Sequence, residues 1–178
     1  FVIDLWARPT KQGGAWMSNL VDASELLGER PVVTNNCNYT RGAALAWDDV
    51  ITLFHEFGHA LHGLLSASRY PSLSGTSTPR DFVEFPSQVN EHWAWEPGVI
   101  VSADQAAAMR AAERFNQGFG SVELFAAMVL DQAWHTTALA ELPTSAEEVE
   151  TFERAALEKV GLSWDLIPPR YRSTYFSH

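Results

Sequence analysis

The sequence predicts a mainly α-helical domain with a small β component near its N-terminus. Apolar residues recur at a helical period after Asp48, two capping boxes and a Thr-Pro pair mark further helix starts, and β-forming residues gather within residues 1–34. A chain of 178 residues with 46% apolar residues is long and apolar enough to bury one core. We therefore expect residues 1–178 to form a single domain.

Two short strands are expected first. Residues 1–6 are rich in β-formers, and a Lys-Gln-Gly-Gly turn follows at residues 11–14. Residues 31–34 are a second candidate strand, which we expect to be closed by three asparagines, Asn35, Asn36 and Asn38.

A long helix is expected over residues 48–68, with Asp48 as its N-cap. Residues 72–79 follow as a loop of Ser, Thr, Gly and Pro. Thr78 then caps a second helix, with Pro79 in its first position, and this helix runs to about residue 95. Pro86 must delay the start of that helix or kink it.

The rest of the chain is expected to be all-helical, with helices over residues 102–116, 121–141 and 145–161. Capping boxes begin the first and the third of these helices. Gly118 and Gly120 separate the first from the second, and Gly161 lies where a C-cap belongs.

The charge excludes some classes of partner. Twelve Lys and Arg residues against 22 Asp and Glu residues give a formal net charge of -10. Such an acidic surface repels phosphate groups, so we expect neither a nucleic acid nor a membrane as partner. The longest uninterrupted apolar run, residues 124–130, is far shorter than the roughly 20 residues that span a bilayer. Cys37 is the only cysteine, which excludes an internal disulfide framework.

The two ends of the chain suggest a piece of a longer protein. It begins at Phe1 without an initiator Met or a signal-peptide pattern, and it stops at His178 without a polar tail. We expect a fragment truncated at both ends, cytoplasmic, with any localisation signal outside it.

The segment His55-Glu56-Phe57-Gly58-His59 contains His-Glu-x-x-His within the expected long helix. Residues i and i+4 share a helix face, so both imidazoles can reach one ion, and Zn²⁺ readily takes such nitrogen ligands. Glu56 can take a proton from a water that attacks a carbonyl. The alternative is a helix with two histidines on a polar seam.

A catalytic zinc site needs a third protein ligand. The third His of the metzincin pattern is absent, since Leu65 stands in its position. We prefer Glu84, a lone acid in a mostly apolar run, over Asp81, which suits a first-turn acid. Glu91, seven residues after Glu84, is well placed to orient a ligand imidazole, with a solvated surface acid as its alternative.

His62 shares the helix stripe of the two motif histidines. His55 and His62 are separated by about 10.5 Å of helix rise, so the three histidines cannot hold one ion. A pair of His59 and His62 would leave Glu56 without a role, and we disfavour it.

Several stretches together resemble the thimet oligopeptidase family of zinc metallopeptidases, with the bacterial peptidyl-dipeptidases (dipeptidyl carboxypeptidases) as the most similar branch. They are Phe-His-Glu-Phe-Gly-His-Ala-Leu-His at residues 54–62, Asp-Phe-Val-Glu-Phe-Pro-Ser-Gln at residues 81–88, Asn-Glu-His-Trp at residues 90–93 and Pro-Pro-Arg-Tyr-Arg-Ser-Thr-Tyr-Phe-Ser-His at residues 168–178. The resemblance covers essentially the whole chain.

The resemblance implies a zincin-like catalytic domain from a larger, mostly helical peptidase with a deep cleft. It implies one Zn²⁺ per chain held by His55, His59 and Glu84, with Glu56 as general base. It makes His178 a residue that contacts substrate and stabilises the tetrahedral intermediate. Members hydrolyse short peptides, and peptidyl-dipeptidases release dipeptides from the free C-terminus. The tyrosines that follow this last His in the family are absent, so we expect the chain to hold the metal but to cleave poorly.

Three functions remain open from the sequence: a zinc peptidase, a catalytically incomplete zinc-binding or peptide-binding fragment, and a metal-free helical interaction module. Mn²⁺ or Co²⁺ can occupy the same ligands as Zn²⁺. Trp93 and Trp95 can line a cleft, although core packing is favoured. Tyr171 and Tyr175 have no assigned role, and the sequence does not predict an oligomeric state.

Overall fold

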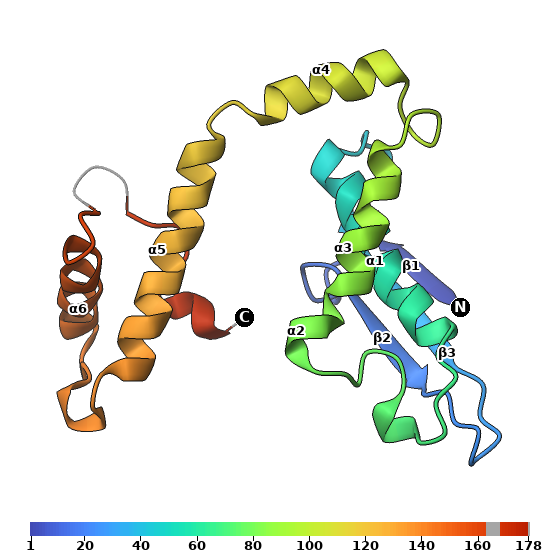
Figure 1. The fold of residues 1–178 in the computed structure, drawn as a ribbon, viewed down its shortest axis with the longest axis horizontal. Coiled ribbons are helices and arrows are strands. Elements are labelled where there is room, and N and C mark those ends of the chain that lie inside the picture. Colours follow the sequence, from blue (N-terminus) through green and yellow to red (C-terminus); the bar gives the residue numbers. More distant parts are fainter. Residues whose placement is uncertain (163–167, 178) are drawn as a thin grey trace. The chain divides into compact units, whose positions relative to one another are not determined.

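The computed structural model of this chain describes residues 1–162 and 168–177 (Figure 1). These residues form two compact units, one over residues 1–108 and one beginning at Met109. About half of the chain is helical, and its only sheet within the described residues lies near the N-terminus, as expected. The interpretation of residues 1–178 as one partial catalytic domain stays a prediction.

The first unit contains a three-stranded sheet made of β1 (Val2–Trp6), β2 (Trp16–Val21) and β3 (Val32–Tyr39). The central strand is β3, which pairs in parallel with β1 and antiparallel with β2. Alternate side chains of β3 are buried, Asn35 and Cys37 among them.

The strands expected over residues 1–6 and 31–34 are confirmed, but the expected end of the second strand is wrong. The asparagines Asn35, Asn36 and Asn38 do not close β3 but lie within it, because the buried Asn35 faces a helix that offers it polar backbone atoms. Strand β2 was not predicted, because its polar centre at Ser18 and Asn19 hides the strand pattern.

Helix α1 (Trp47–Leu64) packs on β2 and β3 with one side and contacts α3 (Phe85–Glu91) with another (Figure 1). At Gly63 a Cβ atom would lie 2.8 Å from Asn19 Oδ1 and 3.0 Å from Val33 Cγ2, so glycine allows the helix to approach the sheet. The N-cap is Ala46 rather than Asp48, because the Asp49 carboxylate accepts the Ala46 N–H at 2.9 Å.

The single helix expected up to residue 95 is divided into three short ones. These are α2 (Arg80–Val83), α3 (Phe85–Glu91) and the 3₁₀ turn η2 (His92–Trp95), preceded by the 3₁₀ turn η1 (Pro71–Leu73). The helix that starts at Arg80 is not delayed but is interrupted at Glu84, and Pro86 lies in the first turn of α3. Of the two effects expected of Pro86, the structure thus shows a break in the helix and not a late start. Pro79, not Thr78, is the N-cap of α2, and no side chain caps it.

Helix α4 (Ala103–Glu113) spans the boundary of the units. The second unit also contains α5 (Gln117–Thr136), η3 (Leu139–Glu141), α6 (Ala146–Glu158) and η4 (Ser173–Ser177). Its core joins α5 to α6 through four buried apolar residues, Ala126, Leu130, Ala156 and Leu157.

Both capping boxes are confirmed: Ser102 exchanges hydrogen bonds with Gln105, and Ser145 exchanges them with Glu148. The turn that ends α6 contains Gly161 at a φ of 78°, which agrees with its expected C-terminal position.

The chain break expected at Gly118 and Gly120 is wrong, because both lie inside α5. The break comes instead at Asn116, whose φ of 57° is in the left-handed region, so α5 starts at Gln117 and not at Ser121. The same helix ends at Thr136, earlier than expected.

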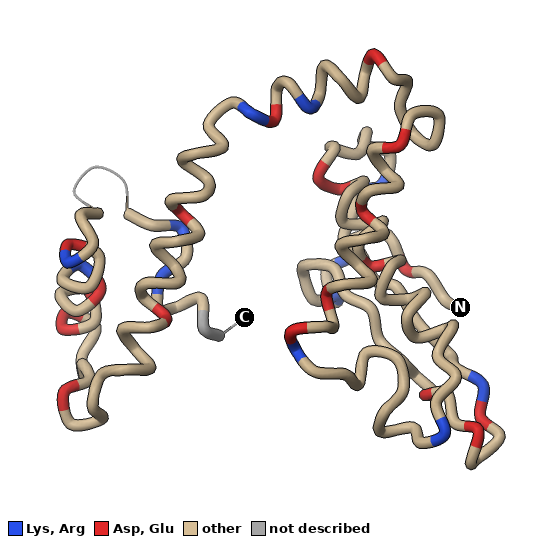
Figure 2. Tube along the Cα trace, in the orientation of Figure 1, with Lys and Arg blue, Asp and Glu red and all other residues tan. Residues whose placement is uncertain are grey.

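Acidic residues are distributed along the chain in both units, with the less numerous basic residues interspersed (Figure 2). Within residues 1–162 and 168–177, no helix is both long and apolar enough to cross a membrane.

Candidate metal centre

Helix α1 presents the two motif histidines on one face. The ring centroids of His55 and His59 lie 4.9 Å apart, with the ring planes at 83° to each other. Both side chains are largely buried, and each Nε2 atom faces the short connection between α2 and α3.

That connection supplies Glu84. Its Oε2 atom lies 3.1 Å from His55 Nε2 and 3.2 Å from His59 Nε2. One atom from each of the three side chains can be chosen so that all lie within 4.8 Å of one another. The structure thus brings together the three residues that the sequence analysis selected as ligands.

Glu91, at the end of α3, contacts the other nitrogen of His55. The distance from His55 Nδ1 to Glu91 Oε1 is 2.7 Å. Because a carboxylate only accepts, Nδ1 carries the proton, and a neutral His55 then presents an Nε2 lone pair to Glu84 Oε2 at 3.1 Å. Two lone pairs at this distance repel each other unless a proton or a metal ion lies between them.

Glu56 is buried next to the cluster. A cavity of about 310 Å³ opens over it, lined by all three cluster residues together with Trp16 and Met17 of β2. Burial raises the pKa of Glu56, the charge of Glu84 raises it further, and only His55 and the Met17 backbone amide act in the opposite direction. Its Oε2 atom has no partner among the described residues.

The crossing of α1 and α3 sets the distance between the ligands. A Cβ atom at Gly58 would lie 2.6 Å from Ser87 Cα and 2.7 Å from Pro86 O, so only glycine permits this approach. Asn90 of α3 donates its side-chain N–H to Phe54 O at 2.6 Å, one residue before the first histidine.

The sheet holds α1 from another side. The carboxamide of Asn35 satisfies both of its polar atoms when its NH₂ group faces Glu56 O. In that orientation the NH₂ group donates to Glu56 O at 3.0 Å, and the carboxamide oxygen accepts from Phe57 N at 3.1 Å. Asn35 is fully buried, so these hydrogen bonds are shielded from water.

Sequence reasoning missed the residues that support the cluster. Asn35 and Asn90 contact backbone atoms of α1 that are far from them in the sequence. Ser87 contacts Glu84 only three residues away, so it alone carries a local spacing signal. Met17 and Trp16 lie in the strand that was not predicted.

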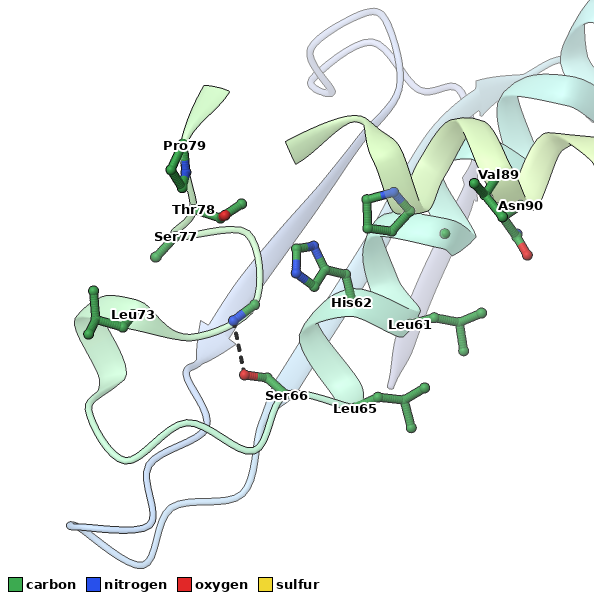
Figure 3. Close-up of a pocket in the computed structure, with 13 residues that line it drawn as sticks. Leu61, His62, Leu65, Ser66, Leu73, Ser77, Thr78, Pro79, Val89 and Asn90 are labelled. Carbon is green, nitrogen blue, oxygen red and sulfur yellow. Dashed lines mark hydrogen bonds between the residues drawn. The ribbon is translucent and has the colours of Figure 1, made fainter. Parts of the chain in front are cut away.

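His62 lies outside the cluster. It lines a second cavity of about 650 Å³ with Leu61 and Leu65, and Figure 3 shows it extending from α1 toward the loop that carries Ser77 and Thr78. Its ring lies 6.2 Å from that of Phe82, and its Nδ1 atom has no partner in the described part of the chain.

The remaining candidates are dispersed. Asp81 is an exposed first-turn acid of α2, as expected. Trp95 is partly buried and packs against Trp47 with ring centroids 4.7 Å apart. Trp93 is 57% exposed, so the expected core packing is wrong for Trp93. His178 lies outside the described residues.

In the second unit, Glu153 of α6 binds the segment that precedes the end of the chain. Its Oε2 accepts from Arg172 Nε at 2.8 Å, and its Oε1 accepts from Ser173 N at 2.7 Å. Trp134 of α5 also donates to Ser173 Oγ, at 2.6 Å. Tyr171 and Tyr175 of this segment contact each other, with ring centroids 4.7 Å apart.

The donor set of the cluster fits a zinc ion. Two imidazole nitrogens and one carboxylate oxygen are a ligand set of catalytic zinc sites, which keep a fourth position open. The largely buried His59 and the Glu56 Oε2 atom, which has no partner among the described residues, border the cavity in which that position would lie.

Comparison with known proteins identifies the family. The sequence model of peptidase family M3 matches residues 1–178. The chain belongs to peptidase family M3. The similarity to the thimet oligopeptidases inferred from the sequence is thereby confirmed, since curated relatives of this M3 chain include oligopeptidases of that kind.

The dipeptidyl carboxypeptidases of Salmonella typhimurium and Escherichia coli are 49% and 48% identical to this M3 chain over 195 aligned positions, which cover all of the chain and 28% of each relative. Oligopeptidase A of Escherichia coli is 44% identical over 109 positions, which cover 56% of the chain and 16% of that relative. The M3 chain thus spans little more than a quarter of the length of the dipeptidyl carboxypeptidases it matches.

Proposed function

We propose that this chain is the metal-binding part of a zincin-like peptidase that hydrolyses peptide bonds in short peptides and releases dipeptides from the free C-terminus. Membership of peptidase family M3 and the identity to the two dipeptidyl carboxypeptidases support this proposal. The observation that carries it is the convergence of His55, His59 and Glu84, where the facing lone pairs call for a cation.

In this proposal His55, His59 and Glu84 hold one Zn²⁺. The ion, when bound, polarises the scissile carbonyl and makes an attacking water more acidic. The Glu56 carboxylate takes a proton from that water and passes it to the leaving amine. His178 donates a hydrogen bond to the oxyanion in the intact enzyme.

Glu91 orients His55 in the proposed centre. The hydrogen bond at 2.7 Å selects the tautomer with the proton on Nδ1, so Nε2 is left as the donor atom for the ion. It also fixes the plane of the ring.

A catalytically incomplete zinc-binding or peptide-binding fragment is the second candidate function. The short span of the chain relative to its relatives favours it for the isolated chain. The cavity beside Glu56 favours catalysis in the intact protein, because a structural zinc site is closed by four protein ligands.

Metal content per chain tests the proposal. We expect about one zinc per chain in the wild type and in Glu25→Ala, which removes an exposed carboxylate outside the cluster, and much less in Glu84→Ala. Glu56→Gln should retain the zinc and, in the longer parent protein, lose nearly all cleavage of short peptides. Zinc-free wild type in both the chain and the parent, or normal turnover by Glu56→Gln, would refute the proposal.

A further inference from the structure

A serine next to the third ligand takes no part in the mechanism above. Ser87 of α3 is fully buried. Its Oγ atom lies 2.8 Å from Glu84 Oε2 and 2.9 Å from Glu84 O. The hydroxyl has one proton, and a charged carboxylate is a stronger acceptor than a carbonyl, so the hydrogen bond to Oε2 is favoured.

The carboxylate of Glu84 needs such an anchor. Its side chain is 49% exposed, and the residue stands at the break between α2 and α3. An exposed glutamate populates many rotamers, and each has to be given up when the carboxylate binds an ion. Burial among neighbouring side chains therefore does not hold Glu84 in one rotamer.

Ser87 is itself held in place. Its Cα lies so close to Gly58 that a single methyl group there would approach it to 2.6 Å, so the backbone of α3 is tightly packed against α1 at this residue. A hydroxyl on a fixed backbone provides a fixed donor.

We propose that Ser87 is a positioning residue that holds Glu84 Oε2 toward both imidazoles, and that it strengthens metal binding through Glu84. This inference rests on the proposed function of the cluster as a metal centre. Oε2 has more than one lone pair, so it can accept from Ser87 and still face the ion. The hydrogen bond selects the rotamer that places Oε2 3.1 Å and 3.2 Å from the two Nε2 atoms.

The test compares Ser87→Ala with Ser74→Ala in the 178-residue chain. Ser74 is a matched control, because it is also fully buried in the first unit and donates to another side chain, Ser66 Oγ, at 3.0 Å. The zinc dissociation constant is measured by competition with a chelator, and the unfolding midpoint is measured on the metal-free proteins. The absorption spectrum of bound Co²⁺ reports the ligand geometry.

We expect Ser87→Ala to bind zinc about 10–100-fold more weakly than the wild type, the range typical for lost hydrogen bonds to metal ligands. Ser74→Ala should bind zinc as the wild type does, although both variants lose a buried hydrogen bond and unfold at similar temperatures without metal. Ser87→Ala should also change the Co²⁺ spectrum. In a Glu84→Ala background, Ser87→Ala should have no further effect on the remaining affinity.

Four results would overturn the inference. Unchanged zinc affinity in Ser87→Ala, beside a wild type that binds zinc, would remove it and leave the proposed function intact. Equal losses of zinc affinity in Ser87→Ala and Ser74→Ala would show that Ser87 has only a general structural role. The same would follow if Ser87→Ala lowered zinc affinity as much in the Glu84→Ala background as in the wild type. A wild type that binds no zinc would overturn the proposed function and this inference with it.

Discussion

The close crossing of α1 and α3 makes Gly58→Ala an informative substitution. The added methyl group would lie 2.6 Å from Ser87 Cα, 2.7 Å from Pro86 O and 2.9 Å from Asn90 Cβ, whereas ordinary contacts begin at 3.4 Å. The first two atoms belong to the backbone, so no rotamer change relieves the overlap. The two helices must therefore separate by about 0.8 Å, from 2.6 Å to 3.4 Å, before the methyl group makes an ordinary contact with Ser87 Cα.

Two effects oppose each other in this variant. Alanine is a better helix former than glycine by about 1 kcal/mol, while overpacking a tight contact costs about 1–3 kcal/mol. Because the contact here is with backbone, overpacking should prevail, with a net loss of up to about 2 kcal/mol in the free energy of unfolding. Glu84 directly precedes α3 and Glu91 is its last residue, so a shift of α3 also moves both carboxylates away from the histidines. Metal–ligand distances tolerate only about 0.2 Å, and we expect zinc affinity to fall more than about 10-fold.

The assay is thermal unfolding of the metal-free protein together with chelator competition for zinc. Gly118→Ala is the matched control, since Gly118 is also inside a helix and a Cβ there would meet nothing within 4 Å. It should stabilise the chain slightly, by up to about 1 kcal/mol, and leave zinc affinity unchanged. If Gly58→Ala unfolds no earlier than the wild type and binds zinc equally well, the close crossing does not set the ligand distances.

Two further predictions concern buried polar contacts. Asn35→Ala should lower the free energy of unfolding by about 1–3 kcal/mol in urea titrations, because the hydrogen bonds to the backbone of α1 are lost. Asn36→Ala, the control, should lower the free energy of unfolding by less. Equal decreases in the two variants would contradict this role of Asn35. Burial alone would raise the pKa of Glu153, but hydrogen bonds from Ser173 and Arg172 outweigh it and hold the pKa below its usual value. The unfolded chain then takes up this proton at a higher pH than the folded chain, so the stabilisation is complete above the usual glutamate pKa of about 4.3 and is lost as the pH falls through the folded-state pKa. Glu153→Gln should therefore cost about 2–3 kcal/mol at pH 7, and the gap to the wild type should narrow in urea titrations at pH 4 and below; a gap independent of pH would refute the assignment.

The local part of the candidate site could be predicted from the sequence. The i, i+4 spacing of His55 and His59 fixes their common face, and a lone acid in an apolar run drew attention to Glu84. Glu91 was selected on the assumption of one continuous helix from Glu84, yet the helix breaks there. The structure nevertheless places Glu91 against His55, because α3 crosses α1 closely enough for its last residue to reach the ring.

The parts that escaped prediction depend on partners distant in the sequence. Asn35 is an unfavourable strand residue by propensity, and only the backbone of α1 gives its buried amide a partner. The low helix propensity of Gly118 and Gly120 predicted a break in the chain, but α5 continues through both residues. The two helices are separated instead at Asn116, which has a left-handed backbone conformation.

The glycines of α1 also link the proposed metal centre to folding. Gly58 and Gly63 allow close approach on two sides of this 18-residue helix, and each costs about 1 kcal/mol of intrinsic helix propensity. A segment of this length and composition has little tendency to be helical in water by itself. The helical spacing that places the two imidazoles of the proposed metal centre on one face is therefore stabilised by the packing of the sheet and α3 against the segment. In the proposed metal centre, ion binding and folding of this unit would therefore form one linked equilibrium: the ion would stabilise the native conformation, and its affinity would report how completely that conformation has formed.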